Sequence, residues 1–130
     1  MEDWAADPLS QGALLRTGVE LFNQGRYLAA HEIFEELWEA TEGAESDFYK
    51  GLIQAAVALH HWQSGNLEGA ARLASSHRRY LAAYLPIHAG LDLEAFLGAM
   101  QTCLRPVQRA QSGTTVAFDF ERRPLLSTRA

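Results

Sequence analysis

One stretch, residues 48–62, is apolar on nearly every side if it is helical, and it limits the fold more than any other feature. Its sequence is Phe-Tyr-Lys-Gly-Leu-Ile-Gln-Ala-Ala-Val-Ala-Leu-His-His-Trp. A helix that is apolar all round is covered by other elements on several faces. The polar residues Lys50, Gln54 and His61 are therefore informative, because buried polar groups need partners. We expect this helix, residues 47–64, to be the central element of the fold.

Capping residues and helix breakers divide the rest of the chain into further helices. Asp7 before Pro8 is typical of a helix start, and a glycine follows the predicted end of that helix. Ser46 and Asn66 are predicted N-caps of the third and fourth helices. Prolines end or kink helices, and two prolines, Pro86 and Pro106, lie near the predicted helix ends. The predicted helices are 8–23, 26–41, 47–64, 67–85 and a fifth that follows the N-cap Asp92.

The C-terminal tail alternates apolar and polar residues, so Val116, Phe118 and Phe120 would lie on one side of an extended segment. With no partner strand in the sequence, we expect this segment to lie as a strap on the helices. Residues 1–7 and 122–130 are expected to be flexible. The predicted fold class is therefore all-α: a single domain, 1–130, forming an antiparallel bundle of about five helices with an extended C-terminal tail.

Composition excludes several classes of protein. The 130 residues are 48% hydrophobic and 21% charged, which suits a globular domain with a real core. The net charge of −5 makes nucleic-acid binding unlikely, since only Arg72, Arg78 and Arg79 suggest a basic patch. The single cysteine, Cys103, excludes an internal disulfide framework and is typical of a cytoplasmic protein. There is no apolar run long enough to span a membrane, so no membrane span is expected. The expected partners are a second copy of the chain or another protein.

The segment whose side chains most suggest a functional site is Tyr27–Trp38, Tyr-Leu-Ala-Ala-His-Glu-Ile-Phe-Glu-Glu-Leu-Trp. On a helix, His31 and Glu35 are neighbours at i and i+4, at the border between the apolar face and solvent. Glu32 falls on the solvent side, and Trp38 lies next to the border. A histidine in this position can share a proton with the carboxylate, or the pair can bind a metal ion.

Two hypotheses for function follow. In the first, His31, Glu35, Gln54 and His61 converge between the second and third helices. His31, Glu35 and His61 would then bind a divalent transition metal, which with an open position could activate water for hydrolysis. The motif His-Glu-x-x-Glu differs from the metalloprotease motif His-Glu-x-x-His at its last position, which makes a protease unlikely. In the second, the same residues form a structural hydrogen-bond network in a non-enzymatic interaction module.

The interaction hypothesis rests on a local resemblance to a tetratricopeptide-like helical hairpin, with a weaker copy 40 residues further on. The pattern positions are occupied by Gly18, Leu21, Gly25, Tyr27, Ala30 and Phe34. A protein of this kind is expected to expose an aromatic or apolar patch, here including Trp4 or Trp62. Of the other histidines, His88 follows a proline in a predicted loop and is expected to be solvated.

Three motifs resemble those of a prokaryotic family, domain of unknown function 309. They lie at residues 22–38, 49–62 and 65–70, and the resemblance covers about residues 14–85. It implies a compact all-helical domain, and it lends no activity, because none is established for the family. It also implies a family motif, and hence ligand-binding candidates, at His31, Glu32, Glu35, Trp38, Gln54 and His61.

Overall fold

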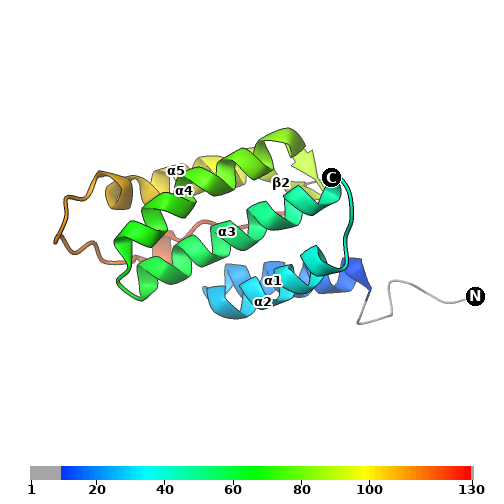
Figure 1. Ribbon diagram of the computed structural model, residues 1–130, viewed down its shortest axis with the longest axis horizontal. Coiled ribbons are helices and arrows are strands. Elements are labelled where there is room, and N and C mark those ends of the chain that lie inside the picture. The colour runs from blue at the N-terminus through cyan, green and yellow to red at the C-terminus, as the bar shows by residue number, and fades with distance from the viewer. Residues whose placement is uncertain (1–9, 130) are drawn as a thin grey trace, which may run out of the picture.

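The computed structural model describes residues 10–129, and its five helices confirm the all-α prediction (Figure 1). The α-helices are α1 (Gln11–Asn23), α2 (Tyr27–Glu39), α3 (Glu45–Gln63), α4 (Leu67–Leu81) and α5 (Leu93–Arg109). The short elements are the 3₁₀ helices η2 (Ala82–Tyr84) and η3 (Phe120–Arg122) and the strands β1 (Ile87–His88) and β2 (Leu91–Asp92). Among these elements, no helix is long and apolar enough to cross a bilayer. The predicted helix start at Asp7 and the predicted flexible residues 1–7 lie outside the described residues.

Helix α3 is the centre of the molecule, as its sequence predicts. In Figure 1 it runs between the α1–α2 pair and the α4–α5 pair. Most of its apolar side chains are buried, and Phe48, Leu52 and Leu59 have no exposed surface. The polar residues Lys50 and Gln54 are half-buried. Because α3 needs cover on several faces, its neighbours are arranged around it rather than in one layer.

Glycines allow two helix pairs to pack closely. A Cβ atom at Gly51 of α3 would lie 2.5 Å from Cγ and 2.6 Å from Cδ2 of Leu81 in α4. A Cβ atom at Gly18 of α1 would collide with the ring of Phe34 in α2. Gly18 and Phe34 are both positions of the tetratricopeptide-like pattern, whereas the contact between Gly51 and Leu81 lies outside it.

The helix N-termini confirm some predicted caps and correct others. The side chain of Asn66 accepts a hydrogen bond from Gly69 N at 2.9 Å, as predicted. Ser10, which was not predicted as a cap, accepts from Ala13 N at 3.2 Å and starts α1 at Gln11. The predicted cap Ser46 is wrong, because α3 already begins at Glu45 and its N-cap, Ala44, makes no side-chain cap bond. The fifth helix has the predicted Asp92 cap, and it continues through Pro106 to Arg109.

His88 is expected to be a solvated loop residue, but the structure places it in β1, with 29% of its side chain exposed and the rest in contact with other groups. Strands β1 and β2 form an antiparallel hairpin that folds His88 back onto the start of α3. Its Nε2 lies 2.7 Å from Oε2 of Glu45. Its ring packs edge-on against Phe48 and Tyr84, with centroid distances of 4.6 and 4.7 Å. Sequence periodicity did not reveal this contact, because it depends on how the hairpin folds back onto α3.

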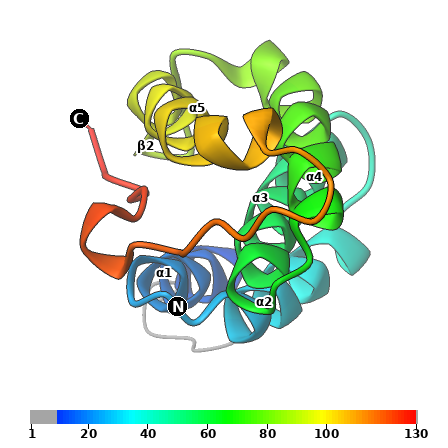
Figure 2. The same cartoon turned by 90° about the vertical axis from the view of Figure 1, so that its left-hand side faces the viewer.

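The C-terminal strap, residues 110–129, crosses the bundle between α5 and α1 (Figure 2). Its Phe118 ring packs against Trp62 at a centroid distance of 5.1 Å, and the Trp62 indole N–H donates to Val116 O at 2.7 Å. Residues 122–129, which the sequence predicts to be flexible, also make specific contacts. Leu126 is buried, and its backbone N–H and C=O bond to the side-chain amide of Asn23 at 2.8 and 2.9 Å.

His77 is a buried histidine on the inner face of α4, with 1% of its surface exposed. Its Nδ1 lies 3.1 Å from Leu73 O, so Nδ1–H donates to that carbonyl. Its Nε2 is buried and bonds to no group among residues 10–129. Burial is the main cause that lowers the pKa of His77 to about 4; the hydrogen bond to the Leu73 backbone opposes it, and the nearby Arg78 adds to it. The ring is therefore neutral in the folded protein at neutral pH.

We expect Gly51→Ala to reduce the free energy of unfolding by about 1–3 kcal/mol, because the added methyl group must displace Leu81. Gly98→Ala in α5 is the matched control, since a Cβ there meets nothing within 4 Å. It is expected to raise stability by up to about 1 kcal/mol through helix propensity. Urea unfolding of both variants measures the difference, and equal effects would contradict the close packing of α3 on α4.

Acidification is expected to destabilise the fold through His77. The unfolded chain takes up a proton at this residue below pH 6.5, whereas the folded protein does so only near pH 4. Stability is therefore lost progressively as pH falls from 6.5 to about 4, by about 3 kcal/mol in total. His77→Leu should remove this component, as shown by urea unfolding at several pH values. An unchanged pH dependence in the variant would contradict the assignment.

Candidate functional site

His31 and Glu35 form the pair that their spacing predicts. Nε2 of His31 lies 3.0 Å from Oε2 of Glu35, one turn along α2. The His31 side chain is 26% exposed and that of Glu35 is 45% exposed, so the pair lies at the surface and is open to solvent on one side. In this arrangement the imidazole donates its Nε2 proton to the carboxylate, which fixes the orientation of the ring.

The facing surface of α3 contributes a second group of polar residues. Nζ of Lys50 lies 4.9 Å from the ring centroid of Trp38, which places the C-terminal end of α2 against the N-terminal half of α3. Gln54 lies one turn further along α3 than Lys50. We call the set His31, Glu35, Trp38, Lys50 and Gln54 the polar seam. All five are half-buried.

Two polar atoms of the seam are buried without a partner. Nδ1 of His31 and Oε1 of Gln54 have almost no accessible surface, and neither forms a hydrogen bond with any group in the described part of the chain. An unpartnered buried polar atom costs about 1–3 kcal/mol of stability. Native structures contain few such atoms, and each one calls for an explanation.

His61 does not join this seam. Its Nδ1 lies 3.4 Å from Nδ2 of Asn66, and its ring packs against Gly69 at the start of α4. Burial lowers the pKa of His61, and electrostatic repulsion from the neighbouring His60 and Arg72 lowers it further. Gln54 and His61 are predicted to share one face of this helix, and the neighbours of His61 are residues of the turn into α4.

The predicted metal ligands are not gathered into one site. Within residues 10–129, no three His, Cys, Asp or Glu side chains lie close enough together to hold a metal ion. His31 and Glu35 are adjacent, whereas His61 lies at the turn between α3 and α4. Glu32, the remaining candidate on α2, is exposed and makes no ion pair with the described residues.

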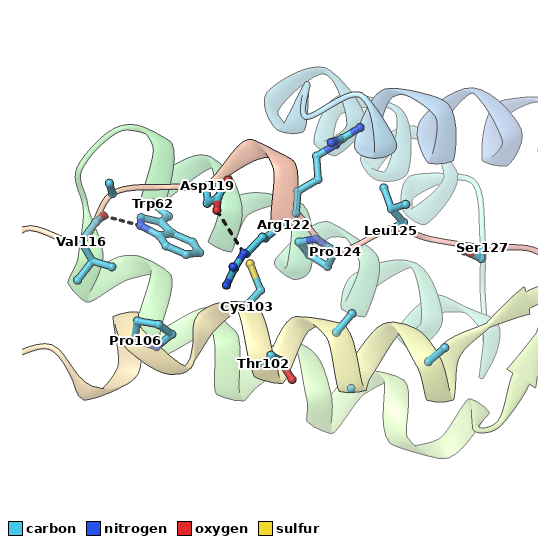
Figure 3. A pocket seen from close by; sticks show the side chains of 15 residues that line it. Trp62, Thr102, Cys103, Pro106, Val116, Asp119, Arg122, Pro124, Leu125 and Ser127 are labelled. Atoms are coloured by element: carbon cyan, nitrogen blue, oxygen red, sulfur yellow. Dashed lines mark hydrogen bonds and ion pairs between the residues drawn. The ribbon is translucent and has the colours of Figure 1, made fainter.

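A second feature was missed by sequence analysis. An apolar groove of about 720 Å³ lies between α5 and the C-terminal strap (Figure 3). One wall is a row of small α5 residues, including Ala95, Ala99 and Cys103, and Trp62 lines the groove as well. The sequence feature that could have revealed the groove is this row of small residues, which lies beside the large core-facing residues of α5. Trp62, expected in an exposed patch, is only 6% exposed, and Trp4 lies outside the described residues.

Comparison with known proteins supports the predicted family. Residues 15–73 match the family described as domain of unknown function (DUF309). An uncharacterised protein of Aquifex aeolicus (strain VF5) is 38% identical over 64 residues, which cover 48% of this chain and 19% of that protein. The uncharacterised protein YpuF of Bacillus subtilis (strain 168) is 34% identical over 106 residues, which cover 79% of this chain and 61% of YpuF.

The chain therefore spans about a fifth of the first relative and about three fifths of the second. The matched segment, residues 15–73, runs from α1 into α4 and contains every residue of the polar seam. It also contains the three motifs from which the resemblance was predicted, which are at residues 22–38, 49–62 and 65–70. Through this segment, the chain belongs to the family described as domain of unknown function (DUF309).

Proposed function

We propose that this protein is a binding domain whose polar seam holds a small polar ligand. The observation that carries the proposal is the pair of buried, unpartnered atoms, Nδ1 of His31 and Oε1 of Gln54. In a purely structural network these atoms would bond to other protein groups. Their lack of partners within residues 10–129 favours a seam that is completed by a ligand.

The chemistry of the seam indicates what such a ligand carries. When His31 donates from Nε2 to Glu35, its neutral ring has an acceptor at Nδ1. Oε1 of Gln54 is also an acceptor. A ligand that satisfies both atoms therefore presents N–H or O–H donors, as amines, amides and polyols do. The ammonium group of Lys50, which lies over the Trp38 ring, offers a cation to a negative group on the same ligand.

The proposal is one of binding and assigns no bond-breaking step. A catalytic zinc site takes three protein ligands, and His31, Glu35 and His61 do not form such a group. The alternative hypothesis, a tetratricopeptide-like interaction module, draws support from the close packing of α1 on α2 across Gly18. It does not account for the unpartnered atom of Gln54, which is why we place it second.

Replacing Gln54 by leucine is expected to stabilise the protein by about 1 kcal/mol, because it removes a buried polar group that has no partner. If Gln54 were instead part of a structural hydrogen-bond network, the same variant would lose about 1–3 kcal/mol. Urea unfolding distinguishes the two outcomes. The control is Gln101→Leu at an exposed position of α5, where a change within about 0.5 kcal/mol is expected.

Binding itself can be tested by NMR with mixtures of small amines, amides and polyols. We expect at least one compound to shift the amide signals of the polar seam in the wild-type protein. The same compound should leave the signals of Gln54→Leu unchanged. A loss of stability in Gln54→Leu, together with no compound that shifts the seam, would show that the seam is structural and would overturn the proposal.

A further inference from the structure

The apolar groove between α5 and the C-terminal strap is held open by contacts at both of its ends. At one end the Trp62 indole N–H donates to Val116 O at 2.7 Å. At the other, Asp92 N donates to Ser127 O at 2.9 Å, and Leu126 is bonded to Asn23. Because these bonds fix the strap, it cannot simply close onto the small side chains of α5. Figure 3 shows the strap and α5 as the two walls of the groove.

The walls of the groove are mainly carbon. Pro106 and Ala99 of α5 face Val116 and Leu125 of the strap across a volume of about 720 Å³. Sites for small molecules typically have volumes of about 300–1,000 Å³ and are lined by apolar groups with a few polar ones. From Ala95 to Pro106 the α5 wall rises about 16 Å along the helix axis, which suits an extended alkyl chain.

Positive charge dominates among the few ionic groups of the groove. Three charged residues line it: Asp119, Arg122 and Arg123. The guanidinium of Arg123 is already hydrogen-bonded to the backbone, since it donates to Asn23 O at 2.7 Å and to Phe120 O at 2.9 Å. Nε of Arg122 lies 3.6 Å from Oδ2 of Asp119, and its side chain is 88% exposed, so most of its donors are available at the mouth. The lining thus combines apolar walls with an available guanidinium.

We propose that this groove binds a medium-chain carboxylate, with the alkyl chain along α5 and the carboxylate at Arg122. Arginine presents a planar fork of donors that matches a carboxylate, and the charge complementarity disfavours a cationic head group. The groove and the polar seam have no residue in common, so this inference does not rest on the function proposed above.

The first test is a titration of the isotope-labelled protein with decanoate, decanol and decylammonium, followed by the indole signal of Trp62. Trp62→Phe serves to assign that signal among the three tryptophans. We expect decanoate to bind more tightly than decanol, and decylammonium to bind most weakly. Shortening the acid should weaken binding about fourfold for each methylene removed, as burial of an alkyl chain requires.

Matched variants of α5 locate the bound chain. Ala99→Trp fills the groove and should weaken decanoate binding at least about tenfold, because a well-packed site does not accept the extra volume. Gln101→Trp adds the same side chain at an exposed position that does not line this groove, and should leave binding unchanged. Circular dichroism and thermal unfolding confirm that both variants are folded.

Two further measurements test the head group and the depth of binding. Arg122→Gln should lower the affinity for decanoate about fivefold, to that for decanol, because the lost ion pair is exposed. Cys103 lines the groove, and its thiol has a pKa raised to about 11 by burial and by Asp119. Bound decanoate should therefore slow the reaction of this single thiol with a small reagent at alkaline pH.

Three outcomes would overturn the proposal. If decanoate binds Ala99→Trp as tightly as Gln101→Trp, the ligand lies elsewhere. If decylammonium binds as tightly as decanoate, the groove does not select an anion. If sedimentation shows that wild-type protein self-associates and that Ala99→Trp abolishes this association, the groove is covered by a second copy instead. Failure of any of these tests leaves the polar-seam proposal standing, because that proposal is tested separately through Gln54.

Discussion

The enclosure of α3 is the constraint on which the rest of the structure depends. This helix has no continuous polar face, so its burial drives the other elements to surround it. Helices α2 and α4 supply most of the cover, and the glycine at position 51 lets α4 approach closely. The hairpin and strap complete it, with His88 packed over Phe48 and Val116 accepting from Trp62.

The sequence predicts the helices well because their signals are local. The caps at Asn66 and Asp92 are confirmed, and the His31–Glu35 pair follows from i,i+4 spacing alone. The failures are non-local. A helical wheel tells which face a residue occupies but not how far along the axis two helices meet. It therefore could not show that His31, Glu35 and His61 do not come together as a group of metal ligands. The position of His88 depends on a hairpin whose direction no periodic pattern encodes.

The two candidate sites arise in different ways. The polar seam is built from side chains on two packed helices, and its residues all lie within the segment that matches the family. The groove is built between a helix and a strap, and apart from Trp62 its lining residues lie outside that segment. A property of the seam is therefore expected to extend to relatives that share only residues 15–73. A property of the groove requires relatives that also share α5 and the strap.

The bond between Asn23 and Leu126 has a consequence for how the protein forms. Its two ends are 103 residues apart, whereas consecutive helices from α1 to α4 pack on their immediate neighbours. Local pairings close short loops and form early, while a contact this distant in sequence carries a larger entropic penalty. During synthesis the first four helices can pair before the strap has been made. The strap is then the last element to be fastened, and until that moment one side of the core faces the surrounding water.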